Sequence, residues 1–298
     1  MGSVPRMSPS PGPLLVVDTP SMLYRAFYAL PKTITGVDDH AVNALLGCAN
    51  LVLREVEEHD PRAVVLCFGA EAAKYRKELL PEYHADREEM PELLVWQWEQ
   101  APLFFKAFGW TIEQHPTLEA DDLLGTLAKK EEEAGGTALI LTGDRDMFQC
   151  ATDKVEVLYV STKIKGGAER MGPKEVKARY GIRPELVPDF IALRGDPSDG
   201  IPGAKGVGEK GASELLREHG SLEALLDAAL RITKPKLRTT LVDSREQLLE
   251  FKDIATLRDS GSKLPVDTPL DTEAAADAAQ EYGMNRLSER LAEWGSGS

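Results

Sequence analysis

Acidic side chains follow several short apolar segments of this sequence. Asp18 ends the first segment, Asp144 ends a later one, and Asp146 stands two residues further on. In an open α/β sheet, ligands bind beyond the carboxyl ends of the strands. We therefore expect these three carboxylates to converge on one crevice, together with the acidic run EADD at residues 119–122.

The run EADD presents Glu119, Asp121 and Asp122 at the start of a predicted helix. Successive residues of a helix are rotated by about 100°, so the three side chains fan outward from its start. Acidic residues in a first turn also stabilise the helix dipole, and taken alone this run favours capping. The argument for chemistry rests on the convergence of the run with the strand-end aspartates.

Carboxylates gathered in one crevice repel each other unless cations neutralise them. Ligand sets made only of oxygen suit Mg²⁺ or Mn²⁺ better than zinc. A pair of such ions binds phosphates, activates water and stabilises a leaving oxygen. The pattern therefore indicates a metal site for phosphoryl chemistry, which we expect to hold two or more Mg²⁺ or Mn²⁺ ions.

A glycine-rich stretch with two lysines, residues 203–212, lies between two predicted helices. Gly206 and Gly208 resemble the turn of a helix-hairpin-helix motif, in which glycines let the backbone approach a phosphate closely. The following helix offers free N–H groups, and Lys205 and Lys210 add positive charge. Such contacts position DNA without reading its sequence. The alternatives are a plain turn and a nucleotide P-loop, which is disfavoured because no Gly-Lys-Ser/Thr follows.

The elements that must position these residues alternate along the first half of the chain. Apolar segments without polar alternation, typical of strands buried on both faces, occupy residues 14–18, 63–68 and 137–144. Helical patterns at 42–58 and 119–135 separate them. This order predicts an α/β fold with a central parallel sheet.

Residues 154–160 alternate and predict a further strand, and beyond about residue 172 the pattern becomes all helical. Ser221 is a predicted N-cap there. The helices expected in this half cover residues 173–181, 212–220, 221–230, 244–258 and 273–293.

The composition limits the classes of function. A net charge of −14, from 35 basic and 49 acidic residues, argues against a general nucleic-acid-binding surface unless many carboxylates bind metal ions. Cys48, Cys67 and Cys150 form no CxxC pair, which predicts free thiols and no disulfide framework or zinc site. Residues 1–13 lack the apolar run of a signal peptide and predict a disordered tail. No stretch has transmembrane length, so we expect a cytoplasmic (nucleoid) protein with no membrane partner.

Four segments resemble, in order and spacing, those of the bacterial and bacteriophage 5′-nucleases, the flap endonuclease family that includes the 5′-3′ exonuclease domain of bacterial DNA polymerase I. These segments cover residues 14–31, 119–128, 142–149 and 193–216. The resemblance runs from about 14 to 260 and, since no polymerase region follows, is to a stand-alone form.

The resemblance implies a PIN-like parallel-sheet nuclease core over residues 14–175, with segment 71–98 as a helical arch or clamp over a single strand. It implies an all-helical helix-three-turn-helix DNA-binding region over 176–260 and a C-terminal helical segment over 261–298. The implied activity is metal-dependent 5′-flap endonuclease and 5′-3′ exonuclease cleavage of DNA in replication and repair. The implied partner is branched or flapped DNA, bound by a monomer, with K⁺ expected at the hairpin.

Carried over position by position, the resemblance assigns roles to individual residues. Ligands of one metal are Asp18, Glu119 and Asp121, those of the second are Asp144, Asp146, Asp196 and Asp199, and Asp122 is a ligand or supports one. Catalytic residues are Arg25, Arg76, Asp121 and Asp144, with the two arginines near the scissile phosphate. DNA-binding residues are Tyr24, Tyr83, His84, Arg87, Lys205, Gly206, Gly208 and Lys210.

Two positions depart from the family pattern. Gly69 stands where the family has an aspartate after the second strand, so we expect a first metal site that keeps more water or prefers Mn²⁺, and Gly69→Asp to shift the preference toward Mg²⁺. His84 replaces an arch lysine, which makes its charge depend on pH. The competing hypotheses are a catalytically weakened DNA-junction-binding protein and a PIN-type ribonuclease, which the length and the hairpin disfavour.

Overall fold

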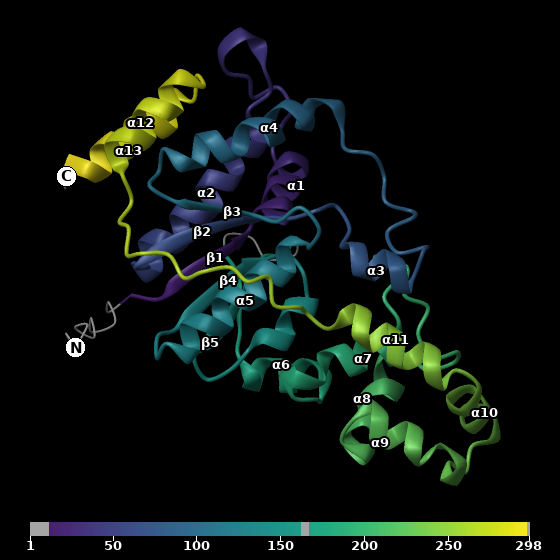
Figure 1. Cartoon of the computed structure of the whole chain (residues 1–298). Coiled ribbons are helices and arrows are strands. Elements are labelled where there is room, and N and C mark those ends of the chain that lie inside the picture. The colour runs from purple at the N-terminus through teal and green to yellow at the C-terminus, as the bar shows by residue number, and fades with distance from the viewer. Residues whose placement is uncertain (1–11, 162–166, 297–298) are drawn as a thin grey trace, which may run out of the picture.

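The protein is built around a twisted, mostly parallel sheet of six strands in the order β3-β2-β1-β4-β5-β6 (Figure 1). The structure, a computed structural model, describes residues 12–161 and 167–296. The strands are β1 (Leu14–Asp18), β2 (Ala63–Phe68), β3 (Thr111–Gln114), β4 (Ala138–Thr142), β5 (Val155–Tyr159) and β6 (Glu169–Met171). Neighbours from β3 to β5 pair in parallel, and β6 is antiparallel to β5.

The central strands are buried on both faces, as their unbroken apolar sequences predict. Along β1, Leu14 and Val16 pack into one hydrophobic cluster, whereas Leu15 and Val17 pack into the other. The edge strands β3 and β6 were not predicted from the sequence. Their burial is incomplete, and β6 has only three residues, so neither has the apolar run that marked the inner strands.

Helices cover the two faces of the sheet. One face carries α1 (Thr19–Ala29), α2 (Asn43–His59), α4 (Glu92–Lys106), α12 (Thr272–Glu281) and α13 (Asn285–Ser296). The other carries α5 (Ala120–Glu133) and the helical region described next. The single helix expected over 273–293 is two helices, because Gly283 adopts φ +76° and turns the chain between them.

The helical region extends away from the sheet at the lower right of Figure 1. It contains α6 (Pro173–Tyr180), α7 (Val187–Arg194), α8 (Glu209–His219), α9 (Leu222–Asp227), α10 (Pro235–Asp243) and α11 (Arg245–Ala255), with α3 (Lys74–Leu79) against α11. Ser221 caps α9 as expected, its side chain accepting from Ala224 N at 3.2 Å. The helix α8 begins at Glu209, three residues before its predicted start, and α9 ends early in a 3₁₀ turn, Ala229–Arg231.

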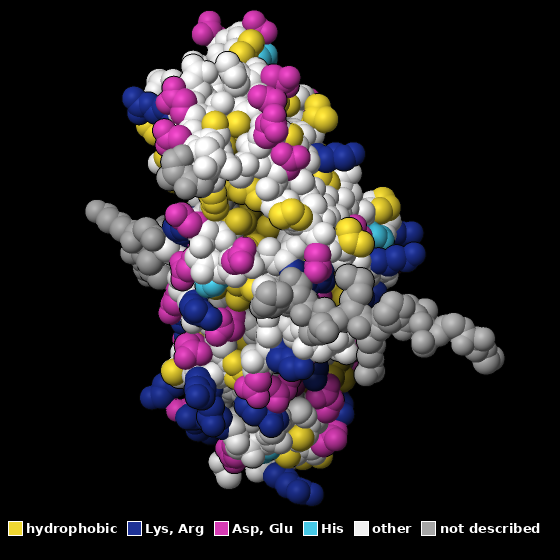
Figure 2. Space-filling view, turned by 90° about the vertical axis from the view of Figure 1, so that its left-hand side faces the viewer, with side chains coloured by type: hydrophobic (Ala, Val, Ile, Leu, Met, Phe, Trp, Pro, Cys, Tyr) yellow, Lys and Arg dark blue, Asp and Glu magenta, His cyan; other side chains and the backbone are white. Residues whose placement is uncertain are grey.

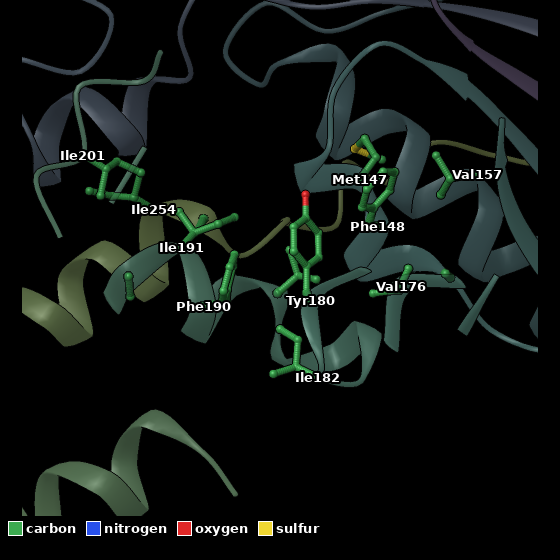
Figure 3. Close-up of a cluster of buried hydrophobic side chains, with 14 of the residues drawn as sticks. Met147, Phe148, Val157, Val176, Tyr180, Ile182, Phe190, Ile191, Ile201 and Ile254 are labelled. Atoms are coloured by element: carbon green, nitrogen blue, oxygen red, sulfur yellow. The ribbon is translucent and has the colours of Figure 1, made fainter. Parts of the chain in front are cut away.

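An apolar cluster joins the helical region to the sheet (Figure 3). Met147 and Phe148 enter it from the 3₁₀ helix Asp146–Cys150, which directly follows β4. Tyr180 from α6 and Phe190 from α7 pack into the same cluster, and the ring centroids of Tyr180 and Phe190 lie 5.0 Å apart. The loop after β4 and the loop after α7 are therefore held by one continuous core.

An extended segment, residues 256–271, crosses from α11 to α12 along the length of α5; we call it the strap. Its backbone is hydrogen-bonded to Asp122 and Thr126 of α5, from Arg258 N and Ser260 N respectively. The strap also accepts hydrogen bonds from Arg62, at the Pro265 carbonyl and at Asp267. The same guanidinium pairs with buried Glu131.

Of the expected tail, residues 1–11 lie outside the described residues, and the Pro13 carbonyl accepts from Arg62 N at 3.0 Å. The cysteines are free, as expected. Within the described ranges, no helix is long and apolar enough to cross a membrane.

Candidate metal centre

A cavity of about 1220 Å³ opens where β1, β2 and β4 end, beside the first turn of α5 and the loop after α7. Six of the eight acidic residues assigned to metal binding line it: Asp18, Glu119, Asp121, Asp144, Asp146 and Asp196. Asp122 and Asp199 do not. The structure thus brings the strand-end acids and the start of α5 together in one crevice.

Asp18 is held at both carboxylate oxygens. Oδ1 accepts from Ser21 N at 3.1 Å, which makes Asp18 the N-cap of α1, and Oδ2 accepts from the Thr142 hydroxyl at 2.7 Å. The same hydroxyl accepts from Asp144 N at 2.9 Å. Thr142 therefore fixes the two strand-end aspartates relative to each other, a role that the sequence analysis did not assign.

Burial raises the pKa of four of the cavity acids. Desolvation is the largest cause for Asp18, Asp121, Asp144 and Asp146, and for the last three neighbouring carboxylates raise the pKa values further. The pKa of Asp144 rises to about 6. A cation that binds here favours the ionised carboxylates and so opposes this rise in pKa. An oxygen-only donor set that resists ionisation unless positive charge is supplied fits hard divalent ions such as Mg²⁺ or Mn²⁺.

Glu119 lies at the cavity wall with its carboxylate engaged by the protein. Oε1 accepts from Ala73 N and from Arg76 Nη1, each at 2.8 Å, and Oε2 accepts from the Tyr83 hydroxyl at 3.3 Å. Arg76 is only 3% exposed and also donates Nε to the Ile254 carbonyl of α11. The structure therefore places Arg76 behind Glu119, where it links α3, α5 and α11, and not on the cavity surface.

Asp122 serves the first turn of α5. Its carboxylate accepts from Glu119 N at 3.3 Å and from Arg258 N of the strap at 2.8 Å, and its side chain is fully buried. The two interpretations of the run EADD therefore apply to different residues, since Asp122 caps the helix while Asp121 faces the cavity.

Asp199 is turned toward the segment between α3 and α4. Its Oδ1 lies 3.2 Å from His84 Nε2. His84 stacks on Tyr83 with ring centroids 4.0 Å apart, and Tyr83 is only 3% exposed. Neither ring lines the cavity; together they connect Asp199 to Glu119 through the Tyr83 hydroxyl.

The remaining residues with roles expected near the scissile phosphate lie at different depths. Tyr24 and Arg87 line the cavity, and Arg87 is held by the Glu71 carbonyl at 3.0 Å. Arg25 lies beneath the loop after β4, where Nη2 donates to the Gly143 carbonyl at 2.8 Å. From there the positive charge of Arg25 lowers the pKa of Asp18, against the larger effect of burial.

The glycine-lysine hairpin projects from the helical region. Lys205, Gly206, Gly208 and Lys210 are exposed, while Val207 between them is buried and anchors the turn. Gly206 adopts φ +83°, and Gly208 caps α8 with open space around it. Lys and Arg side chains are more numerous on the lower half of the face in Figure 2, where Asp and Glu side chains lie among them.

The cavity also contains functional candidates that the sequence analysis missed. Arg145 and Arg194 line it, the latter paired with Asp196 at 2.6 Å, and Trp98 stands at its rim. Both arginines lie within two residues of assigned acids in the sequence, so their proximity was available as a signal. Trp98 had no such signal, because tryptophan in a helix usually indicates core packing.

Gly69 lines the cavity and has no room for a side chain. A Cβ atom there would lie 2.3 Å from Ala120 N and 2.4 Å from the carbonyl carbon of Glu119. These are backbone atoms of the start of α5. Any side chain at this position, including that of Gly69→Asp, must therefore first displace that turn, and the expected shift of metal preference toward Mg²⁺ stays a prediction.

Another group of possible ligands lies away from the cavity, at the end of α2. Glu55, Glu58 and His59 bring ligand atoms within 4.8 Å of one another, and in the described part of the chain no other three do so. Arg54 already pairs with Glu55 at 2.7 Å, which accounts for this group as an ion-pair cluster. The cavity acids stand further apart, as mutual repulsion of carboxylates favours.

Comparison with known proteins gives matches along nearly the whole chain. Residues 13–181 match the family model described as 5′-3′ exonuclease, N-terminal resolvase-like domain, and residues 182–281 match 5′-3′ exonuclease, C-terminal SAM fold. DNA polymerase I of Caldicellulosiruptor bescii is 36% identical over 279 residues, covering 93% of this chain and 32% of that protein. The thermostable DNA polymerase I of Thermus thermophilus is 36% identical over 286 residues, covering 96% and 32%. The chain thus spans about a third of the length of these relatives.

Solved structures with the same fold include a bacteriophage T5 5′-exonuclease with bound zinc (TM-score 0.66, 19% identity, 94% of this chain and 98% of that one). A T5 flap endonuclease in a pseudo-enzyme-product complex with DNA and metal ions gives a TM-score of 0.69 at 18% identity, with coverage of 94% and 98%. The catalytic core of Rad2 with DNA substrate gives 0.61 at 16% identity, covering 94% and 91%. These similarities confirm the predicted fold class, and the matched sequences confirm the family resemblance.

The raised pKa of Asp144 predicts how stability depends on pH without divalent ions. The folded state binds this proton more tightly than the unfolded state, whose pKa is near 3.8, so stability is lost as the pH rises through the window from 3.8 to about 6. Asp144→Asn should raise the unfolding free energy at pH 7.5 by roughly 1 to 3 kcal/mol in chelator. Urea unfolding at several pH values measures this. The curves of the variant and wild type should converge near pH 4, and parallel curves would refute the account.

Gly69→Ala should destabilise the protein by about 1 to 3 kcal/mol, because the new methyl group overlaps the backbone of α5. The matched control is Gly211→Ala within α8, where an added Cβ meets only Val207 Cγ1 at 3.6 Å. That change should stabilise by about 0.5 to 1 kcal/mol, as alanine does in a helix. Thermal unfolding of the two variants would contradict the steric argument if both shifts had the same sign.

Proposed function

The chain belongs to the 5′-3′ exonuclease family, and we propose that it is a metal-dependent, structure-specific 5′ nuclease. In this proposal it hydrolyses DNA phosphodiester bonds as a 5′-flap endonuclease and 5′-3′ exonuclease in replication and repair. The observation that carries it is the cavity in which acids from β1, β4, α5 and the loop after α7 meet. The T5 and Rad2 structures, described with metal ions and with DNA substrate, support the same activity.

Two or more Mg²⁺ or Mn²⁺ ions are the proposed cofactors. One ion would be held by Asp18, Glu119 and Asp121, and the second by Asp144, Asp146 and Asp196, with Asp122 supporting Glu119. Asp199, the fourth proposed ligand of the second ion, would have to release His84 and turn toward the cavity. When bound, such a pair supplies a nucleophile at neutral pH and stabilises the charge of the leaving oxygen. The proposed K⁺ at the hairpin rests on the exposed backbone of that turn.

The protein's own groups would orient the DNA. Arg87, Arg145 and Arg194 offer guanidinium groups to the phosphate backbone inside the cavity. The Thr142 hydroxyl keeps Asp18 and Asp144 at a fixed separation. Arg25 biases Asp18 toward its ionised form, which is the form that binds a cation.

The proposed substrate is branched or flapped DNA, bound by a monomer in the nucleoid. The hairpin would grip the duplex, and the segment 71–98 would act as the arch or clamp for the single strand. This division places the nuclease core at 14–175, the DNA-binding region at 176–260 and a helical segment at 261–298. The competing function is a junction-binding protein with weakened catalysis, which the crowded Gly69 and the engaged Glu119 motivate.

Cleavage of a 5′-labelled flap duplex tests the proposal. Wild type should cut near the junction with Mg²⁺ or Mn²⁺ and leave a 5′-phosphate on the downstream strand, and chelator should abolish the product. Asp144→Asn should lower kcat at least about 100-fold, since even residues that only support a metal ligand contribute 10- to 100-fold. Asp277→Asn, the same change at an exposed site on α12, should keep full activity. Metal-independent binding with no product would favour the junction-binding protein.

Replacing both hairpin lysines, Lys205→Ala with Lys210→Ala, should weaken duplex binding. The slope of log Kd against log salt should fall by about 0.9 for each DNA phosphate that the variant no longer neutralises. Fluorescence anisotropy in chelator over a salt series measures the slope. A control pair of exposed lysines far from the hairpin, Lys106→Ala with Lys129→Ala, should leave it unchanged. An unaltered slope in the hairpin variant would remove the hairpin from the DNA-binding surface.

A further inference from the structure

A second groove, of about 560 Å³, adjoins the metal cavity at the end of β2. The two share Gly69 and Trp98, so they are neighbouring compartments of one surface. The groove is lined by Phe68, Gly69, Trp98, Glu99, Pro102, Gln114, His115 and Pro116. None of the residues assigned to metal or DNA binding from the sequence lies in it.

Trp98 forms the partition between the two compartments. Its ring makes edge-to-face contacts with Tyr24 of the metal cavity, at 6.1 Å and 68°, and with Phe68 of the groove, at 6.2 Å and 85°. Trp98 is only partly buried, although it lies in a helix that packs on the core. A large aromatic surface is thus held in a fixed orientation and left accessible.

The groove combines flat apolar walls with polar groups. Pro102 lies inside α4 and has no N–H to give to the Trp98 carbonyl four residues earlier. His115 Nδ1 accepts from Thr117 N and Leu118 N at 3.2 and 3.0 Å, so its proton is on Nε2, which can donate. The side-chain amide of Gln114, which is exposed, can donate and accept. These are the groups that the edge of a heterocyclic base requires.

The charges of the two compartments differ. The metal cavity includes three arginines, whereas the groove includes one charged residue, Glu99, and no Lys or Arg. A phosphate would be repelled by Glu99 in the groove. The cavity would attract it once cations neutralise the nine acidic residues that line the cavity beside the three arginines. Gly69, which lines both, presents no side chain between them. A nucleotide with its phosphate in the cavity could therefore extend its base into the groove.

We propose that this groove binds one unpaired nucleobase of the DNA, stacked on Trp98, next to the phosphate held in the metal cavity. The proposal rests on the proposed function, because it takes single-stranded DNA as the ligand. Aromatic stacking of this kind is tolerant of sequence. The groove would therefore require an unpaired base without selecting its identity, which favours a frayed or single-stranded position at the cleavage site.

Flap substrates that carry one abasic position, and non-cleavable linkages at the junction, test the proposal with Mg²⁺ present, so that cations neutralise the acids of the cavity. The abasic site is placed in turn at each of the two nucleotides on either side of the junction. At one of these positions it should raise the Kd of wild type about 5-fold or more, as loss of a stacked base does. In Trp98→Leu the intact flap should bind with this weakened affinity, and the abasic site should have no further effect. Trp98→Phe should restore part of the difference.

The control is Trp96→Leu on the same helix. Trp96 stacks on His40 with ring centroids 4.2 Å apart and lines neither compartment, so this variant should keep the abasic effect. A measurement without any variant is the fluorescence of 2-aminopurine at the sensitive position, which wild type should quench on binding. An abasic effect of equal size in Trp98→Leu and wild type, or none at any position, would overturn the proposal.

Cleavage of the intact flap by wild type with Mg²⁺ or Mn²⁺ separates the two proposals. Metal-dependent cleavage without an abasic effect would refute the groove alone. An abasic effect without cleavage would refute the nuclease and leave the groove as a single-strand binding site. If a proline-rich peptide bound the groove tightly and did not displace the flap DNA, the groove would be a protein-binding site. That result would overturn the proposal.

Discussion

The repulsion among carboxylates in a poorly solvated crevice is the constraint on which this structure depends. Charged groups are most unfavourable where they are desolvated and close to groups of the same charge, and nine acidic residues line this cavity. Groups outside the set of acids restrain several of them. Thr142 holds Asp18, Arg76 holds Glu119, and Arg194 holds Asp196. Because the carboxylates are held close together, binding of a cation is favoured at this site.

Those restraints tie the cavity to the rest of the fold. Arg76 carries α3 against α11, and Tyr83 and His84 extend the connection from Glu119 to Asp199. On the other side, Met147 and Phe148 follow the acidic loop after β4 into the core that supports α6 and α7. The loop carrying Asp196 and the hairpin beyond it are thus built on the same packed layer as β4. The structure thus connects the hairpin and the acidic loop after β4 through one packed core.

The parts of this arrangement that follow from local sequence were predictable, and the parts that depend on distant partners were not. Strand-end aspartates and the start of α5 could be located because apolar runs and acidic first turns are local patterns. That Asp122 turns inward was not predictable, since its partner Arg258 N lies 136 residues away. Likewise Arg76 has the sequence position of a phosphate contact, yet its buried setting comes from Glu119 and the Ile254 carbonyl. The crowding at Gly69 is a property of backbone approach, which no residue pattern reports.

The strap has a consequence for how this chain can be divided. It supplies Arg258 N to Asp122 and Ser260 N to Thr126, both on the helix that begins at the cavity. A fragment that stopped at the end of α11 would remove the Arg258 N–H from Asp122 and the Ser260 N–H from Thr126, and so weaken the hold on the start of α5. The segment that follows the helical region is therefore part of the nuclease-core packing, because it bonds to α5. The chain thus returns along α5 after all the acids have been supplied, and the strap supports the helix whose first turn carries Asp121 into the cavity.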